Sequence, residues 1–218
     1  MRKLMLACLA LGFLAGAAFI AWAADAATVR IVKEDVVLLL TFKDRSTLKV
    51  TSRPTRVKPG EYEVKKINFY KQDEDKKTWE IRCEKNYGTL KMLMIAPGQD
   101  KIIDPGPPLR LKLYVRQGKG EASDTYNISL SVVGRYNEVY DPWAYKPGDR
   151  KHKPRPPVVI IKDPAGEVLK KAVMEVTGTT CRYHWKFGDR KGNFTLDFDM
   201  DLGPFELVHD AKKEYVIE

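Results

Sequence analysis

The sequence is poor in the residues and motifs that most enzymes use for catalysis. Its 218 residues include three histidines and three cysteines, and no histidine stands at a metal-ligand spacing from another histidine or a cysteine. It has no G-x-S-x-G nucleophile elbow and no glycine-rich loop to hold a phosphate. We therefore expect a protein that is not an enzyme and that uses no cofactor.

After residue 26 the sequence also lacks the hydrophobic period of an amphipathic helix. Apolar residues instead alternate with polar ones in several runs, among them residues 61–65, 109–116, 126–132 and 194–201. The polar positions of two of these runs are Arg110, Lys112, Tyr114 and Arg116, and Asn127, Ser129 and Ser131. Such alternation places successive side chains on opposite faces of a half-buried antiparallel strand. The pattern predicts an all-β fold.

The length and the turns predict two antiparallel β-sandwich domains of Ig-like type. Glycine, proline and aspartate punctuate the alternating runs, as in sandwiches built from many short strands. Residues 104–108 read Asp-Pro-Gly-Pro-Pro, which cannot lie within a central strand. We therefore expect a first domain over residues 27–104 and a second over residues 105–218, with a long loop at residues 135–157.

Residues 1–26 have the layout of a secretory signal peptide, predicted as a helix. Arg2 and Lys3 precede an apolar run from Leu4 to Ala24, and two A-x-A sites end at Ala23 and Ala26. This layout predicts an extracytoplasmic protein, whether periplasmic, secreted or on the cell surface. The run is also long enough to span a bilayer, so an uncleaved signal anchor is the alternative, and only that alternative implies membrane contact.

Cys83 and Cys181 are the two cysteines outside the signal segment. Each shares the apolar phase of its predicted strand, so both thiols are expected to point into cores, as small hydrophobic groups do. Their expected positions in different domains favour free thiols. A disulfide between them remains the alternative, because an extracytoplasmic compartment permits one.

Two short segments resemble motifs of secreted bacterial β-sandwich modules. Residues 59–64, Pro-Gly-Glu-Tyr-Glu-Val, resemble the strand entry of PEGA and carboxypeptidase-regulatory-like modules. Residues 163–168, Asp-Pro-Ala-Gly-Glu-Val, resemble the turn and strand of similar Ig-like modules. The resemblance implies an extracytoplasmic sandwich protein of an uncharacterised kind, and it brings no catalytic residues with it.

The long loop holds the best candidates for ligand binding. Its aromatic residues and the basic, proline-rich tract after them suit sugar rings and anionic groups. The candidate residues are Tyr136, Tyr140, Trp143, Tyr145, Lys151, Lys153 and Arg155. The alternative is that the aromatic side chains pin the loop onto its own domain. The expected partner is an anionic envelope polymer or another envelope protein, and no motif indicates a nucleic acid.

Asp197, Asp199 and Asp201 form a weak calcium candidate, because hard cations prefer several carboxylate oxygens. Their alternation with Phe198 and Met200 favours instead a strand with a polar outer face, and no metal is expected. The sequence thus predicts a non-catalytic binding or structural protein of the cell envelope. A secreted hydrolase or its accessory domain, and a metal-binding envelope protein, are the alternatives.

Overall fold

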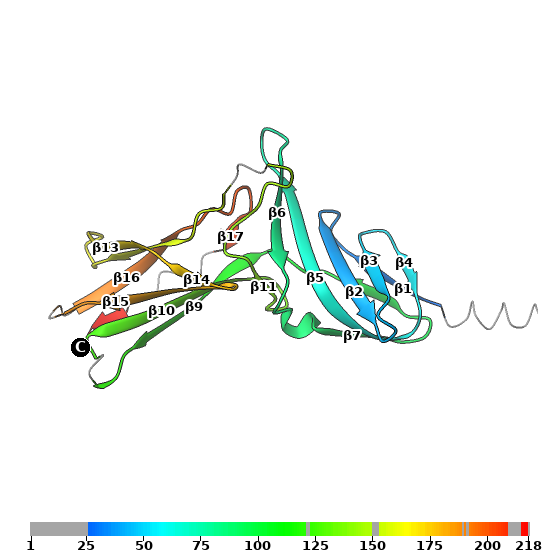
Figure 1. Ribbon diagram of the computed structural model, residues 1–218, viewed down its shortest axis with the longest axis horizontal. Helices are drawn as coiled ribbons and strands as arrows, with labels where there is room; N and C mark the ends of the chain where they lie inside the picture. Colours follow the sequence, from blue (N-terminus) through cyan, green and yellow to red (C-terminus); the bar gives the residue numbers. More distant parts are fainter. Residues whose placement is uncertain are drawn as a thin grey trace, which may run out of the picture.

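The computed structural model describes residues 26–120, 123–149, 153–188, 190, 192–208 and 215–217. The protein is all-β, as predicted, with a single turn of 3-10 helix, η1 (Gly88–Leu90), in the described part. Two lobes lie end to end along the long axis of the molecule (Figure 1). Residues 1–25, which hold the predicted signal helix, lie outside the described residues. Within the described part, no helix is long and apolar enough to cross a membrane.

The N-terminal lobe packs a three-stranded sheet against a five-stranded sheet. The smaller sheet has the order β4-β1-β8, with β1 and β8 parallel. The larger has the order β3-β2-β5-β6, and β7 pairs with the start of β5. The strands are β1 (Ala27–Ile31), β2 (Val36–Phe42), β3 (Thr47–Val50), β4 (Thr55–Val57), β5 (Gly60–Gln72), β6 (Thr78–Cys83), β7 (Met92–Ile95) and β8 (Asp100–Ile103).

The C-terminal lobe is a second pair of sheets. One has the order β14-β15-β10-β9-β17, with β11 paired to the end of β10, and the other has the order β13-β12-β16-β18. All their pairs are antiparallel except β17 with β9. The strands are β9 (Leu109–Gln117), β10 (Thr125–Val133), β11 (Val139–Tyr140), β12 (Val158–Lys162), β13 (Val168–Val173), β14 (Glu175–Thr177), β15 (Thr180–Lys186), β16 (Gly192–Asp199), β17 (Leu207–Val208) and β18 (Tyr215–Ile217).

The strands form where the alternation of apolar and polar residues predicted them. In β10, for example, Tyr126, Ile128 and Leu130 are buried, whereas Asn127 and Ser129 between them are not. Each fully buried side chain of this kind contributes about 1.5–3 kcal/mol to folding. The buried side chains gather into two clusters, one in each lobe.

The two lobes do not separate cleanly at the predicted boundary. Residues 104–108 connect β8 to β9, but the core of the N-terminal lobe continues beyond them. It takes in six buried residues from later in the chain: Leu109, Val132, Tyr140, Ala144, Leu202 and Phe205. The hairpin of β9 and β10 therefore contributes to both cores, with Leu109 and Val132 in the first and Ile128 and Leu130 in the second.

Candidate functional site

The predicted aromatic loop forms the seam between the lobes. Tyr140 in β11 is fully buried in the core of the N-terminal lobe, which excludes it from contact with a ligand. The Val139 amide donates to the Asn86 carbonyl at 2.7 Å. Tyr145 exchanges two backbone hydrogen bonds with Glu80 of β6, at N–O distances of 2.7 and 2.8 Å. The alternative that the loop packs on its own domain describes it only in part. The segment β11 pairs with β10 of the C-terminal lobe, whereas Val139 and Tyr145 bond to the N-terminal lobe.

The polar side chains at this seam bind one another. Arg82 donates to the Glu80 carboxylate at 2.9 Å, and its guanidinium lies 4.2 Å from the centre of the Tyr145 ring. The Tyr145 hydroxyl donates to Asp141 at 3.0 Å. Burial raises the pKa of the Asp141 carboxyl above its ordinary value. Trp143 is half-buried beside them. This network holds the lobes together and leaves little for a ligand to bind.

Glu138 anchors the turn that precedes this network. Its side chain is fully buried, and each carboxylate oxygen accepts hydrogen bonds. Oε1 accepts from the Gly106 amide at 2.7 Å and from the Tyr140 hydroxyl at 3.2 Å. Oε2 accepts from the amide of Tyr136 at 2.7 Å. A Cβ on Gly134 would lie 2.2 Å from Oε1, so a larger residue there would displace the Glu138 carboxylate. Glu138 thus ties the segment between the lobes to the aromatic loop.

The basic part of the predicted site does not join the aromatic part. Lys151 lies outside the described residues. Lys153 and Arg155 are exposed, and the Arg155 guanidinium lies 3.9 Å from the Asp201 carboxylate. The described candidates therefore do not share one open surface.

The aspartates proposed for calcium do not form a metal site. Lys162 of β12 pairs with Asp197 at 2.5 Å, and Arg155 faces Asp201. Asp199 is exposed at the end of β16. Among the described residues, no group of three or more histidine, cysteine, aspartate or glutamate side chains is placed to hold a metal ion.

The two cysteines lie in different cores and are not bonded to each other. Cys83 belongs to the cluster of the N-terminal lobe and Cys181 to that of the C-terminal lobe, so the disulfide alternative is wrong. The Cys83 thiol donates to the Asn86 carbonyl at 3.2 Å. Burial raises the pKa of each thiol to about 12. Both side chains act as packing groups.

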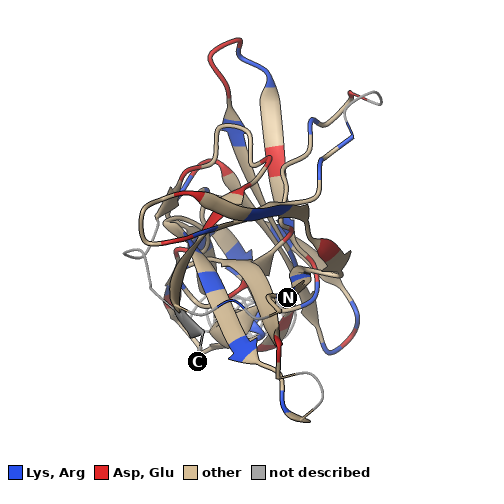
Figure 2. Ribbon diagram, turned by 90° about the vertical axis from the view of Figure 1, so that its left-hand side faces the viewer, with Lys and Arg blue, Asp and Glu red and all other residues tan. Residues whose placement is uncertain are grey.

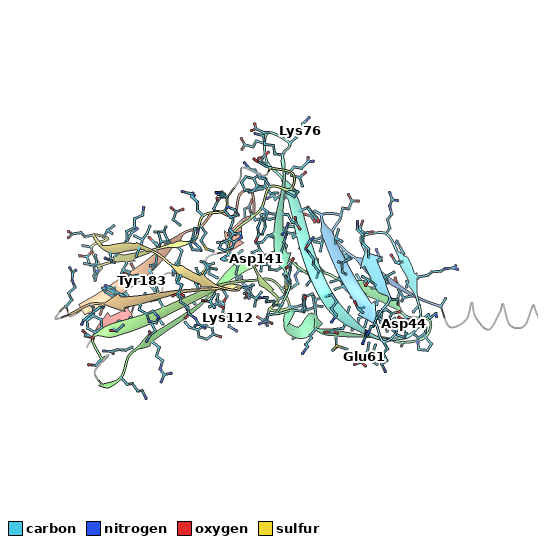
Figure 3. The ribbon with its side chains drawn as sticks, viewed as in Figure 1. Asp44, Glu61, Lys76, Lys112, Asp141 and Tyr183 are labelled. Carbon is cyan, nitrogen blue, oxygen red and sulfur yellow. The ribbon has the colours of Figure 1, made fainter. Side chains whose placement is uncertain are left out.

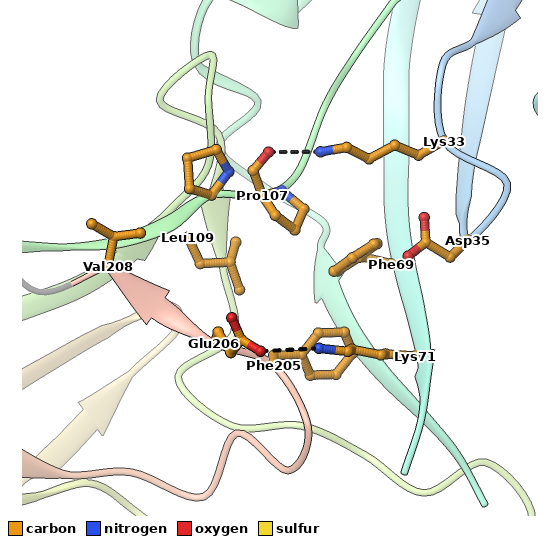
Figure 4. Close-up of a pocket in the computed structure, with 10 residues that line it drawn as sticks. Lys33, Asp35, Phe69, Lys71, Pro107, Leu109, Phe205, Glu206 and Val208 are labelled. Carbon is orange, nitrogen blue, oxygen red and sulfur yellow. Dashed lines mark hydrogen bonds and ion pairs between the residues drawn. The ribbon is translucent and has the colours of Figure 1, made fainter. Parts of the chain in front are cut away.

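A pocket of about 380 Å³ opens where the two lobes meet (Figure 4). Its apolar wall includes Phe69 of β5 and Phe205, whose ring centres lie 5.1 Å apart. Leu109 and Val208, at the start of β9 and in β17, lie on the opposite side. Its volume lies near the lower end of the range of small-molecule pockets, about 300–1,000 Å³.

Charged side chains surround this pocket, and most of them are already engaged. Lys33 donates to the Pro107 carbonyl at 2.7 Å, and Lys71 lies 3.7 Å from the Glu206 carboxylate. Burial raises the pKa of Asp35, against the opposing effect of Lys33 and Lys71. Positive and negative groups balance here, so the pocket has no charge preference that would identify a ligand.

The most distinctive surface is the outer face of the sheet β14-β15-β10-β9, which we call the basic face. Its side chains alternate with those that enter the core of the C-terminal lobe. Its residues are Arg110, Lys112, Tyr114 and Arg116 of β9, Asn127, Ser129 and Ser131 of β10, and Arg182, His184 and Lys186 of β15. Figure 2 looks onto this end of the molecule and shows lysine and arginine positions along its strands. Lys112 projects outward from this lobe in Figure 3.

The strand register brings these residues together in rows. Ser129 lies between Tyr114 on one side and Arg182 on the other, and Asn127 lies between Arg116 and His184. The strands β9 and β15 flank β10 and are therefore about 10 Å apart. Long cationic side chains thus border a central strand whose outward side chains are short.

Most cations of the basic face lack an acidic partner. Of those named, Lys186 pairs with Asp124 at 3.2 Å, but Arg110, Lys112, Arg116 and Arg182 take part in no ion pair within the described part of the chain. Several lysines of the N-terminal lobe, among them Lys43, Lys65 and Lys66, are paired with glutamates. Within the described residues, others there, such as Lys49 and Lys85, form no ion pair. Glu175, on the edge strand β14, is the acid paired in register with Arg182. The basic face therefore carries a local excess of positive charge.

Alternation in the sequence identified the outward residues of β9 and β10 one strand at a time. It did not show that β9, β10 and β15 are neighbours, because β15 follows β10 by nearly fifty residues. The pairing of Asn127 with both Arg116 and His184 is a property of the register alone. The sequence did hold one indication of the basic face, since Arg110, Lys112 and Arg116 share one phase of the alternation.

Comparisons with known proteins do not name a family. No family model matches the chain, and no curated protein matches it. A leucine-rich repeat protein of Bacteroides thetaiotaomicron, solved as a crystal structure, is similar at 8% identity and a TM-score of 0.25. The match covers 87% of this chain but 23% of that one. A likeness this weak carries no argument about fold or function.

Proposed function

We propose that this is an exported, non-catalytic binding protein that holds an anionic polymer of the cell envelope on its basic face. The observation that carries the proposal is the row of cations without acidic partners, Arg110, Lys112, Arg116 and Arg182, on one side of one sheet. The signal layout of residues 1–26 supports export.

A sheet face of this kind suits an extended polymer. Every second side chain along a strand recurs at about 6.8 Å, so successive anions of a linear chain can meet successive cations. Arg110 and Arg116 stand six residues apart on β9, a distance of about 20 Å. Unpaired cations also raise the rate at which an oppositely charged partner is captured. The affinity comes from the simultaneous pairing of several of these cations with anions of the polymer.

The test is to remove the charge of this face without changing the core. A variant with Arg110, Lys112, Arg116 and Arg182 all changed to glutamine should bind polygalacturonate and polyphosphate at least roughly tenfold more weakly than the wild type. Four cations that each contribute about 1 kcal/mol near an anionic surface are sufficient for that loss. Binding is measured by fluorescence anisotropy of the labelled polymers.

The matched control removes four exposed cations from the N-terminal lobe. Changing Lys49, Arg53, Arg56 and Lys85 to glutamine alters the net charge by the same amount. We expect this variant to bind within roughly twofold of the wild type, because its four charges belong to the N-terminal lobe and not to the basic face, and screening weakens the effect of distant charges. Equal losses in both variants, or no binding of either polymer by the wild type, would refute the proposal.

A further inference from the structure

The centre of the basic face is lined by small polar side chains. The outward residues of β10 are Asn127, Ser129 and Ser131, and all three are half-buried. The Ser131 hydroxyl lies 3.5 Å from the Thr180 hydroxyl, and the Asn127 amide oxygen meets the His184 ring. These groups form a floor between the cationic side chains of β9 and β15. A polymer that lies here meets hydroxyl and amide groups as well as charge.

An exposed aromatic ring stands at the edge of this floor. Tyr114 is 59% exposed, and its position in the register is directly beside Ser129. The Lys112 ammonium lies 5.4 Å from the centre of its ring. Aromatic rings that expose this much apolar surface pack well against the C–H faces of flat or ring-shaped ligands. A purely electrostatic surface has no need of such a ring.

From these features we infer that the polymer is a linear acidic polysaccharide, bound along β10. Its carboxylates would meet the flanking arginines and lysines, its hydroxyl groups the floor at Asn127 and Ser129, and one sugar ring the face of Tyr114. The planar guanidinium of arginine makes two parallel hydrogen bonds to a carboxylate, as it does to a phosphate, so the preference for a sugar polymer comes from the ring and the floor. This inference rests on the proposed function. It adds that each repeating unit of the polymer is a sugar ring that carries a carboxylate and hydroxyl groups.

The experiment compares two polymers that carry the same number of negative charges at one ionic strength. Polygalacturonate offers carboxylates, hydroxyls and sugar rings, whereas polyphosphate offers charge alone. We expect the wild type to bind polygalacturonate at least roughly fivefold more tightly, because the ring and floor contacts add to the ionic ones. Tyr114→Ala should abolish most of that preference and leave polyphosphate affinity within roughly twofold. Tyr114→Phe, which keeps the ring, should retain the preference.

A second variant tests the floor independently. Ser129→Val keeps a good strand-forming residue but replaces the hydroxyl, so it should also weaken polygalacturonate selectively. Melting curves verify that each variant is folded. Equal affinity for both polymers in the wild type, or a preference that survives Tyr114→Ala and Ser129→Val, would overturn the inference while the proposed function stands. If the wild type binds neither polymer, the proposed function itself fails, and the inference with it.

Discussion

Replacement of Glu138 by alanine should destabilise the whole molecule, because this carboxylate ties the segment between the lobes to the buried start of the aromatic loop. The change leaves the Gly106 amide, the Tyr136 amide and the Tyr140 hydroxyl without their acceptor. The bonds of the Gly106 amide and the Tyr140 hydroxyl are buried. Each buried donor that loses its partner costs about 1–3 kcal/mol, so the expected loss is at least about 2 kcal/mol. That is a large fraction of the roughly 5–15 kcal/mol by which a typical domain is stable.

The assay is urea unfolding followed by tryptophan fluorescence and circular dichroism. Glu84→Ala is the control, because its exposed carboxylate pairs with Lys66 at 2.7 Å and its loss should cost less than about 1 kcal/mol. Glu138→Gln should fall between the two, since it keeps one acceptor oxygen. A free energy of unfolding for Glu138→Ala within about 1 kcal/mol of the wild type would refute the role given to Glu138.

Three further outcomes are expected. A fragment of residues 27–104 should show no cooperative unfolding transition, because six core residues of its lobe come from later in the chain; a sharp transition would show that this segment folds alone. In the folded protein Cys83 and Cys181 should resist alkylation at neutral pH, as judged by peptide mass mapping, because burial raises the pKa of both thiols to about 12. Asp35→Asn should raise the melting temperature at about pH 7 but not at about pH 3. The raised pKa of Asp35 means that its charged form disfavours the folded state, a cost that appears only as the pH rises above the ordinary aspartate value; a gain at both pH values would assign the effect to something other than charge.

The strands were predictable from the sequence because their alternation is a local property. The buried and outward residues of β9 and β10 follow the pattern of residues 109–116 and 126–132. The seam was not predictable, because nothing near Tyr140 in the sequence indicates that its ring enters the core of the other lobe. Aromatic residues in a long loop resemble a binding site whether they face solvent or another domain. Only long-range pairing, such as that of Tyr145 with Glu80, distinguishes the two cases.

Two close approaches of the chain accompany the contact between the lobes, and one of them involves the aromatic loop. A Cβ on Gly88 would lie 2.0 Å from the Tyr136 carbonyl oxygen, and one on Gly203 would lie 2.5 Å from the ring of Trp79. Both glycines also have positive φ, so a larger residue would be strained as well as crowded. Before the fold is known, these glycines look like ordinary turn residues. They are needed because two segments far apart in the sequence come close at each glycine. That long-range contact cannot be recognised in a single sequence.

The central claim is that the basic face, and not the aromatic loop or the pocket, holds the polymer. The most direct measurement is a nuclear magnetic resonance titration of the isotope-labelled protein with short polygalacturonate fragments. We expect the largest amide shifts in β9, β10 and β15, centred on Tyr114 and Ser129, with little change near Tyr145 or Phe69. Shifts concentrated in residues 135–157 or around Phe69 and Phe205, with the basic face unchanged, would contradict the account.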